Sequence, residues 1–144
     1  MTTPAQHDTR IPPAPSRLSA LRGNCMGAAV LLIVQFGLGI GLNLYVTVPS
    51  GKSFFATVFS SAVLAVHAIV ALALLGASIS ALVRAIRVRR AVAFTAAGLA
   101  AIVVAAGAGV SFAGRPGNGA SLTMALATAV AMFCYLAAVF SLRA

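Results

Sequence analysis

The sequence predicts an all-α membrane protein, an antiparallel bundle of four transmembrane helices. Of its 144 residues, 61% are hydrophobic and only 8% are charged, whereas a soluble domain is about half apolar and a quarter charged. The charged residues leave four uncharged runs, and each exceeds the ~20 residues that a helix needs to cross hydrocarbon. The runs are 23–51, 53–83, 91–114 and 116–142.

The segment before the first run is rich in proline and arginine and has few large apolar side chains. It buries too little surface to offset its ordering entropy. We therefore expect residues 1–22 to be a disordered basic cytoplasmic tail and residues 23–144 to form the transmembrane domain. The first span, 24–48, is longer than the ~7–15 apolar residues of a cleavable signal peptide and is expected to be retained.

The other three spans are expected at 54–83, 91–113 and 120–142. Residues 49–53 make a very short connection with turn chemistry, so the first two spans are predicted to be antiparallel neighbours. The segment 114–119 (GRPGNG) is a second turn.

The basic residues predict the topology. The chain has a net charge of +9, and eight of its ten basic residues lie in the tail, between the second and third spans, or after the fourth. Only Lys52 and Arg115 lie on the other side. The positive-inside rule then places both termini in the cytoplasm and the chain in the cytoplasmic (inner) membrane. No aromatic or polar pattern accompanies the arginines, which argues against nucleic-acid binding.

Small residues line two of the spans at a spacing that lets helices approach closely in lipid. The first span has Gly37 and Gly41 in a GxxxG pattern. One interpretation is a homodimer or a larger membrane complex, and the other is packing within the chain. The third span repeats a small residue at every fourth position, at Ala93, Ala97, Ala101, Ala105, Gly109 and Ala113.

Polar side chains inside the spans are costly in lipid and therefore mark candidate sites. Gln35 and His67 both lie within about 3 Å of the midpoints of their spans, which predicts a hydrogen-bonded clamp between two helices. The alternative is a functional histidine acting as proton relay or metal or haem ligand. Asn43 lies about 11 Å further out, where it lines a shallow outer pocket or pairs with neighbouring polar groups. Gln35, Asn43 and His67 form the candidate intramembrane polar site.

The sequence offers no catalytic residue, metal site or cofactor site. It has no glutamate, and its one acidic residue, Asp8, lies in the tail, so no carboxylate is present in the spans for acid–base or metal chemistry. Cys25 and Cys134 are expected at different depths, too far apart for a disulfide. Because His67 is the only histidine in a span, haem would need a second ligand from a methionine or a symmetric partner.

Three stretches resemble a family of small four-helix bacterial membrane proteins, mainly from actinobacteria. They are residues 35–49 (QFGLGIGLNLYVTVP), His67-Ala68 and residues 118–121 (NGAS). The family has no assigned activity, so the resemblance implies topology and origin rather than chemistry. Two features depart from it: the connection after Pro49 is shorter, and Arg115-Pro116 interrupts the approach to the last span.

The sequence combines many small-residue stripes with a lack of reactive groups. This combination favours a non-enzymatic accessory or interaction subunit that is embedded in the lipid bilayer. The alternative is a small transporter or ligand-binding membrane protein that uses the surface of Gln35, Asn43 and His67. A third hypothesis is a haem-binding electron carrier.

Overall fold

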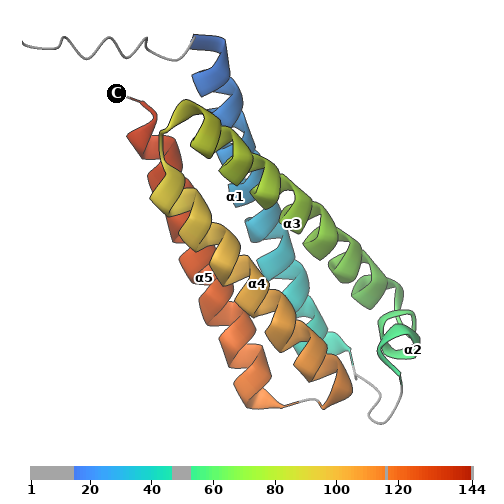
Figure 1. Ribbon diagram of the computed structural model, residues 1–144. Coiled ribbons are helices and arrows are strands. Elements are labelled where there is room, and N and C mark those ends of the chain that lie inside the picture. The colour runs from blue at the N-terminus through green and yellow to red at the C-terminus, as the bar shows by residue number, and fades with distance from the viewer. Residues whose placement is uncertain (1–14, 47–52, 116, 144) are drawn as a thin grey trace, which may run out of the picture.

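A computed structural model describes residues 15–46, 53–115 and 117–143. Within these residues the protein is all-helical and contains no strand. Four of the helices are long and apolar enough to cross a membrane, which indicates a multi-pass membrane protein. The helices are α1 (Pro15–Tyr45), α2 (Phe54–Val58), α3 (Ala62–Val88), α4 (Val92–Gly114) and α5 (Asn118–Ser141) (Figure 1).

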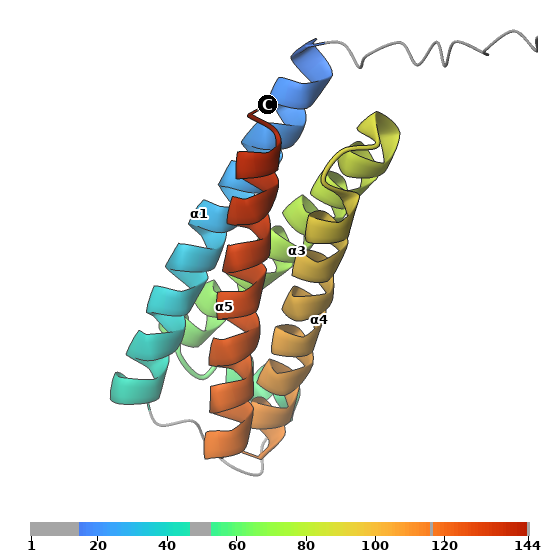
Figure 2. The same ribbon diagram turned by 90° about the vertical axis from the view of Figure 1, so that its left-hand side faces the viewer.

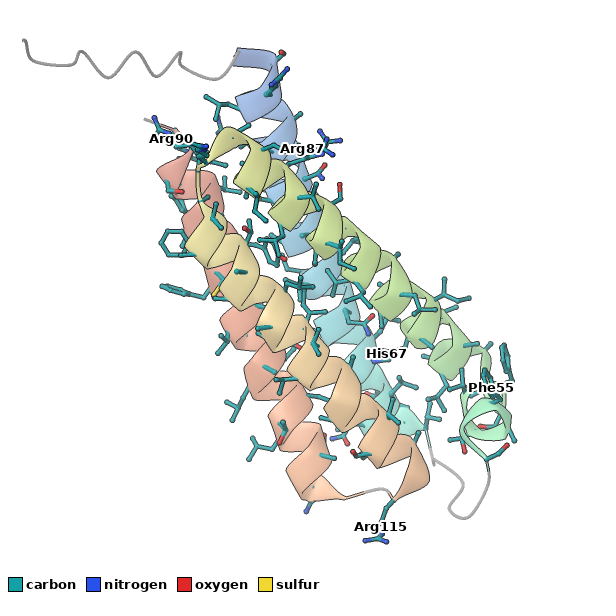
Figure 3. The ribbon with its side chains drawn as sticks, viewed as in Figure 1. Phe55, His67, Arg87, Arg90 and Arg115 are labelled. Atoms are coloured by element: carbon teal, nitrogen blue, oxygen red, sulfur yellow. The ribbon has the colours of Figure 1, made fainter. Side chains whose placement is uncertain are left out.

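The four long helices pack into a single bundle. Helix α1 packs against α3 and α5, and α4 packs against α3 and α5, so the helices form a closed ring. The start of α1, the turn between α3 and α4 and the end of α5 lie at the same end of the bundle (Figures 1 and 2). We call this end the arginine end, after Arg17, Arg22, Arg84, Arg87, Arg89, Arg90 and Arg143. Arg115 lies at the opposite end (Figure 3).

Along α1 and α3, successive buried residues are separated by alternately three and four positions. This average of about 3.5 residues is the spacing at which helices pack side by side over many turns. In α1 the buried positions of this pattern are Leu21, Cys25, Ala28, Leu32, Gln35 and Leu42. In α3 they are Leu74, Ser78, Ala81, Ala85 and Val88.

The hydrophobic core is gathered toward the arginine end. Helix α3 has no buried residue before Leu74, and α5 has none before Ala127. The core there consists mostly of alanine, leucine and valine, with the large side chain of Tyr135 fully buried among them. Small side chains allow the backbones to come close, which is how helices gain contact where lipid removes the hydrophobic driving force.

Helix α1 begins earlier than the expected tail boundary allows. It starts at Pro15, so residues 15–22 are helical instead of belonging to the tail. Proline suits the first helical position because its missing N–H has no partner there in any case. Leu21 is fully buried and anchors this extra length in the core. The remainder of the expected tail, residues 1–14, lies outside the described residues.

The expected second span, 54–83, is two helices in the structure. Helix α2 ends at Val58 and α3 begins at Ala62. Between them the Ser60 hydroxyl donates to the Thr57 carbonyl at 2.7 Å, and Ser61 has an extended backbone. Serine side chains that bond nearby carbonyls compete with helix continuation. Helix α2 packs against α3 and α4, with Thr57 and Val58 buried.

The remaining boundaries lie close to the expected ones. Helix α3 continues to Val88, five residues beyond the expected end at 83, and its last turns bury Ala85 and Val88. Helices α4 and α5 begin and end within two residues of the expected spans 91–113 and 120–142. The turn between α3 and α4 is tight, since Arg89 and Ala91 both adopt left-handed backbone conformations.

Candidate functional site

Gln35 and His67 meet between α1 and α3. The Nε2 atoms of the two side chains are 3.0 Å apart, which is hydrogen-bonding distance. Gln35 is only 8% exposed, and His67 is half-buried. Both residues continue the 3.5-residue patterns of their helices, and Figure 3 shows His67 on the side of α3 that faces α1. The bond therefore ties the two helices together at a point beyond the main core.

The imidazole ring of His67 lies close to Gly39 of α1. A Cβ at position 39 would lie 3.6 Å from Cε1 of His67, which is ordinary van der Waals contact. Gly39 follows Gln35 by one helical turn, so it lies on the same face of α1. The ring thus rests against the backbone of α1 while its Nε2 faces the amide.

Each member of the pair keeps one polar atom without a partner. Oε1 of Gln35 and Nδ1 of His67 are buried and form no hydrogen bond with any residue the structure describes. A neutral imidazole has one donor and one acceptor nitrogen. The Gln35 amide nitrogen can only donate, so Nε2 of His67 accepts in this contact and Nδ1 carries the hydrogen. The bond leaves an acceptor on Gln35 and a donor on His67 unused. Buried groups of this kind are uncommon and point to an additional polar partner or to function.

Asn43 lies apart from the other two residues of the expected polar site. It is exposed, and its Oδ1 accepts a hydrogen bond from the Ser121 hydroxyl of α5 at 3.4 Å. Eight residues separate Asn43 from Gln35 along α1, so the two side chains point in different directions around the helix. The structure therefore joins Gln35 to His67 and places Asn43 in a separate contact between α1 and α5.

Two shallow hollows mark the surface of the described residues, and neither is lined by Gln35, Asn43 or His67. One lies at the arginine end between α1 and the end of α5, lined by Leu18, Ser19, Arg22, Gly23, Met26 and Leu142. We call it the arginine-end hollow. The other lies at the opposite end, lined by Val110, Ser111, Gly114 and Arg115.

The histidine and cysteine side chains of the described residues do not gather in one place. Among them, no three histidine, cysteine, aspartate or glutamate side chains come together as a metal site would require. Cys25 and Cys134 are both buried and free. Nε2 of His67, one of its two nitrogens able to bind haem iron, faces Gln35.

The small-residue stripe of α4 enters the interface only in part. Ala93 and Ala97 are exposed, and Ala101 and Ala105 are half-buried. Nearer the end of the helix, a Cβ at Gly109 would lie 3.4 Å from Sδ of Met124, and Ala113 is buried. An exact four-residue repeat drifts around a helix that has about 3.6 residues per turn, so one end of the stripe leaves the contact.

Gly37 and Gly41 face away from the bundle. A Cβ at either position would meet no neighbouring atom within 4 Å in the described chain. Packing inside this chain therefore does not use their GxxxG spacing.

Sequence reasoning missed a close contact between α4 and α5. Tyr135 of α5 is fully buried against Gly98 of α4. Its hydroxyl lies beside Ser78 of α3, but the geometry does not meet the criteria for a hydrogen bond. The 3.5-residue spacing of Thr95, Gly98 and Ile102 is the signal that marks this face of α4.

A second missed contact is polar. The Asn24 side-chain amide donates to the Ser80 hydroxyl at 2.9 Å and links α1 to α3 nearer the arginine end. No family model, curated protein or solved structure matches the chain. The resemblance to small actinobacterial membrane proteins therefore stays a prediction.

Proposed function

We propose that this protein is a non-enzymatic accessory or interaction subunit of the cytoplasmic membrane, an antiparallel four-helix bundle with both termini in the cytoplasm. Its contact surface is the outward face of α1, through which it forms a homodimer or joins a larger complex. The single observation that carries the proposal is the row of open glycines on this face.

The outward face has the same spacing as a packed interface. Its positions follow each other at alternating steps of three and four, opposite the buried positions of α1, and are Gly27, Val30, Val34, Gly37 and Gly41. At all three glycines a Cβ would meet no atom within 4 Å among the described residues. Val30 and Val34, between them, are also exposed.

Lipid gives helices no hydrophobic reason to associate, so association depends on close backbone approach. Glycine lacks a side chain and leaves a shallow furrow, while valine is stiff and loses little entropy when it is covered. A row at 3.5-residue spacing, with valines between glycines, suits a second helix at a small crossing angle. This supports a partner helix on α1, and a second copy of the chain supplies one.

Native mass measurement of the purified chain in detergent tests the proposal. We expect a two-chain species, converted to single chains by Gly37→Leu together with Gly41→Leu. These positions have open space, so the variants should keep their helix content. Val103→Leu and Val104→Leu, on an exposed face of α4, are the matched controls and should leave the mass unchanged. A single-chain species at every concentration, or equal effects from both pairs, would contradict the homodimer.

The second candidate function is a small transporter or ligand-binding membrane protein. It is favoured by Oε1 of Gln35 and Nδ1 of His67, which have no hydrogen-bond partner among the described residues. A polar ligand could form hydrogen bonds with these two atoms. Reconstituted protein and its His67→Gln variant, compared in a solute-flux assay, distinguish this candidate from the first. The haem hypothesis needs only an absorption spectrum, in which a colourless preparation argues against it.

A further inference from the structure

The positive charge at the arginine end has no counter-charge in the described residues. The only acidic residue of the chain is Asp8, which precedes the described part. Arg22 on α1 and Arg87 in the last turn of α3 are both exposed. Arginine forms paired hydrogen bonds with phosphate groups, so uncompensated arginines at a membrane surface attract anionic headgroups.

The arginine-end hollow combines one of these arginines with an apolar lining. Leu18, Met26 and Leu142 supply the apolar surface, and Arg22 and Ser19 supply the polar groups. Gly23 lies between them, and a Cβ there would meet no atom within 4 Å in the described chain. The lack of a side chain at Gly23 therefore leaves the hollow open, and a larger residue at this position would fill the hollow.

From Arg22 inward along α1 the lining of the hollow becomes apolar, and Leu18 adds an apolar side chain one turn outward of Arg22. Met26 follows Arg22 by four residues, which places it about 6 Å further into the bundle along the helix axis. It is 42% exposed and therefore open to a ligand. On the other side, the Arg143 guanidinium lies 4.5 Å from the centre of the Phe140 ring, which holds a second cation close to Leu142. This order matches a phospholipid, whose charged phosphate is followed by an acyl chain.

We propose that the arginine-end hollow binds one anionic phospholipid. Its phosphate lies at Arg22, and the first part of an acyl chain lies over Gly23 against Met26 and Leu142. The inference rests on the proposed membrane embedding but does not depend on the dimer. A free phosphate ion fits the hollow less well, because three of its six lining residues are large and apolar.

Native mass spectrometry of the full chain in detergent tests the site. The probes are phosphatidylglycerol and phosphatidylcholine with identical acyl chains, offered at equal concentration. We expect wild-type protein to retain one phosphatidylglycerol in preference to phosphatidylcholine. Arg22→Gln should lower this preference about fivefold, the effect of one basic residue near an anionic surface. Arg87→Gln is the matched control, since it removes the same charge from the same end outside the hollow, and should change the preference less than twofold.

Two further measurements separate the two ends of the lipid. Met26→Ser should reduce binding of both lipids and leave the headgroup preference unchanged. Inorganic phosphate at millimolar concentration should not displace the bound lipid. Equal binding of the two lipids, equal effects of Arg22→Gln and Arg87→Gln, no effect of Met26→Ser, or displacement by phosphate would each overturn the proposal. The number of chains in the same spectra reports separately on the proposed dimer.

Discussion

Tyr135 lies so close over Gly98 that a Cβ at position 98 would be 2.7 Å from Cε2 of the ring. The two residues come from α5 and α4, the pair of helices with the most extensive contact in the bundle. Because the Tyr135 hydroxyl also lies beside Ser78 of α3, one buried side chain connects three of the four long helices.

Replacing Gly98 with alanine should therefore destabilise the bundle. The added methyl group has to displace the ring or separate the helices, and overpacking of this kind costs about 1–3 kcal/mol. Thermal or denaturant unfolding in detergent measures the change. Gly107→Ala, in the same helix but with open space around it, is the control and should be neutral or slightly stabilising, because alanine favours helix. Equal stability of the two variants would show that the ring of Tyr135 can move aside without lowering the free energy of unfolding.

A double-mutant cycle should reveal coupling between Gln35 and His67. His67→Leu leaves the Gln35 amide without its partner and should lower the free energy of unfolding by about 1–2 kcal/mol. His67→Gln keeps a donor and an acceptor and should retain most of the stability. Adding Gln35→Leu to His67→Leu should recover part of the loss. A coupling energy of zero would mean that the 3.0 Å contact contributes nothing to folding.

Leucine substitutions along the stripe of α4 should differ in effect according to burial. Ala105→Leu places a large group in a half-buried position and should cost about 1–3 kcal/mol. Ala97→Leu lies on an exposed face of the same helix and should behave like Val103→Leu, with little change. Unfolding midpoints in detergent compare the three variants, and equal tolerance at positions 97 and 105 would count against the interface.

Reporter fusions should establish the topology. Fusions after residue 143 and within residues 84–90 should report the cytoplasm, because the arginines are concentrated there. Fusions near Lys52 and Arg115 should report the exterior. A C-terminus outside the cytoplasm would contradict the four-span arrangement with both termini inside.

Hydropathy and charge predict the long helices well because both properties extend over many residues. The expected third and fourth spans differ from α4 and α5 by at most two residues at each end. The break after α2 could not be found in this way, since the apolar run continues across it. The local feature at the break is the Ser60 side chain, which donates a hydrogen bond to the Thr57 carbonyl.

Matched depth predicts the contact between Gln35 and His67, whereas polarity alone and an exact four-residue repeat do not predict which residues meet. Gln35 and His67 were expected together because their depths match, and the structure places them in contact. Asn43 was grouped with them by its polarity alone, and it contacts Ser121. The four-residue repeat of alanines predicts a different packing face of α4 and therefore misses Gly98. The steps of three and four through Thr95, Gly98 and Ile102 describe the buried face correctly.

The uneven distribution of buried side chains means that the bundle should open from one end. The part of α3 before Leu74 contains no buried residue, so few contacts hold its backbone hydrogen bonds closed against local fluctuation. In detergent we expect amide protons there to exchange with solvent sooner than those between Leu74 and Val88. The region around Tyr135 should resist exchange longest, which would make the arginine end the last part of the molecule to lose its structure.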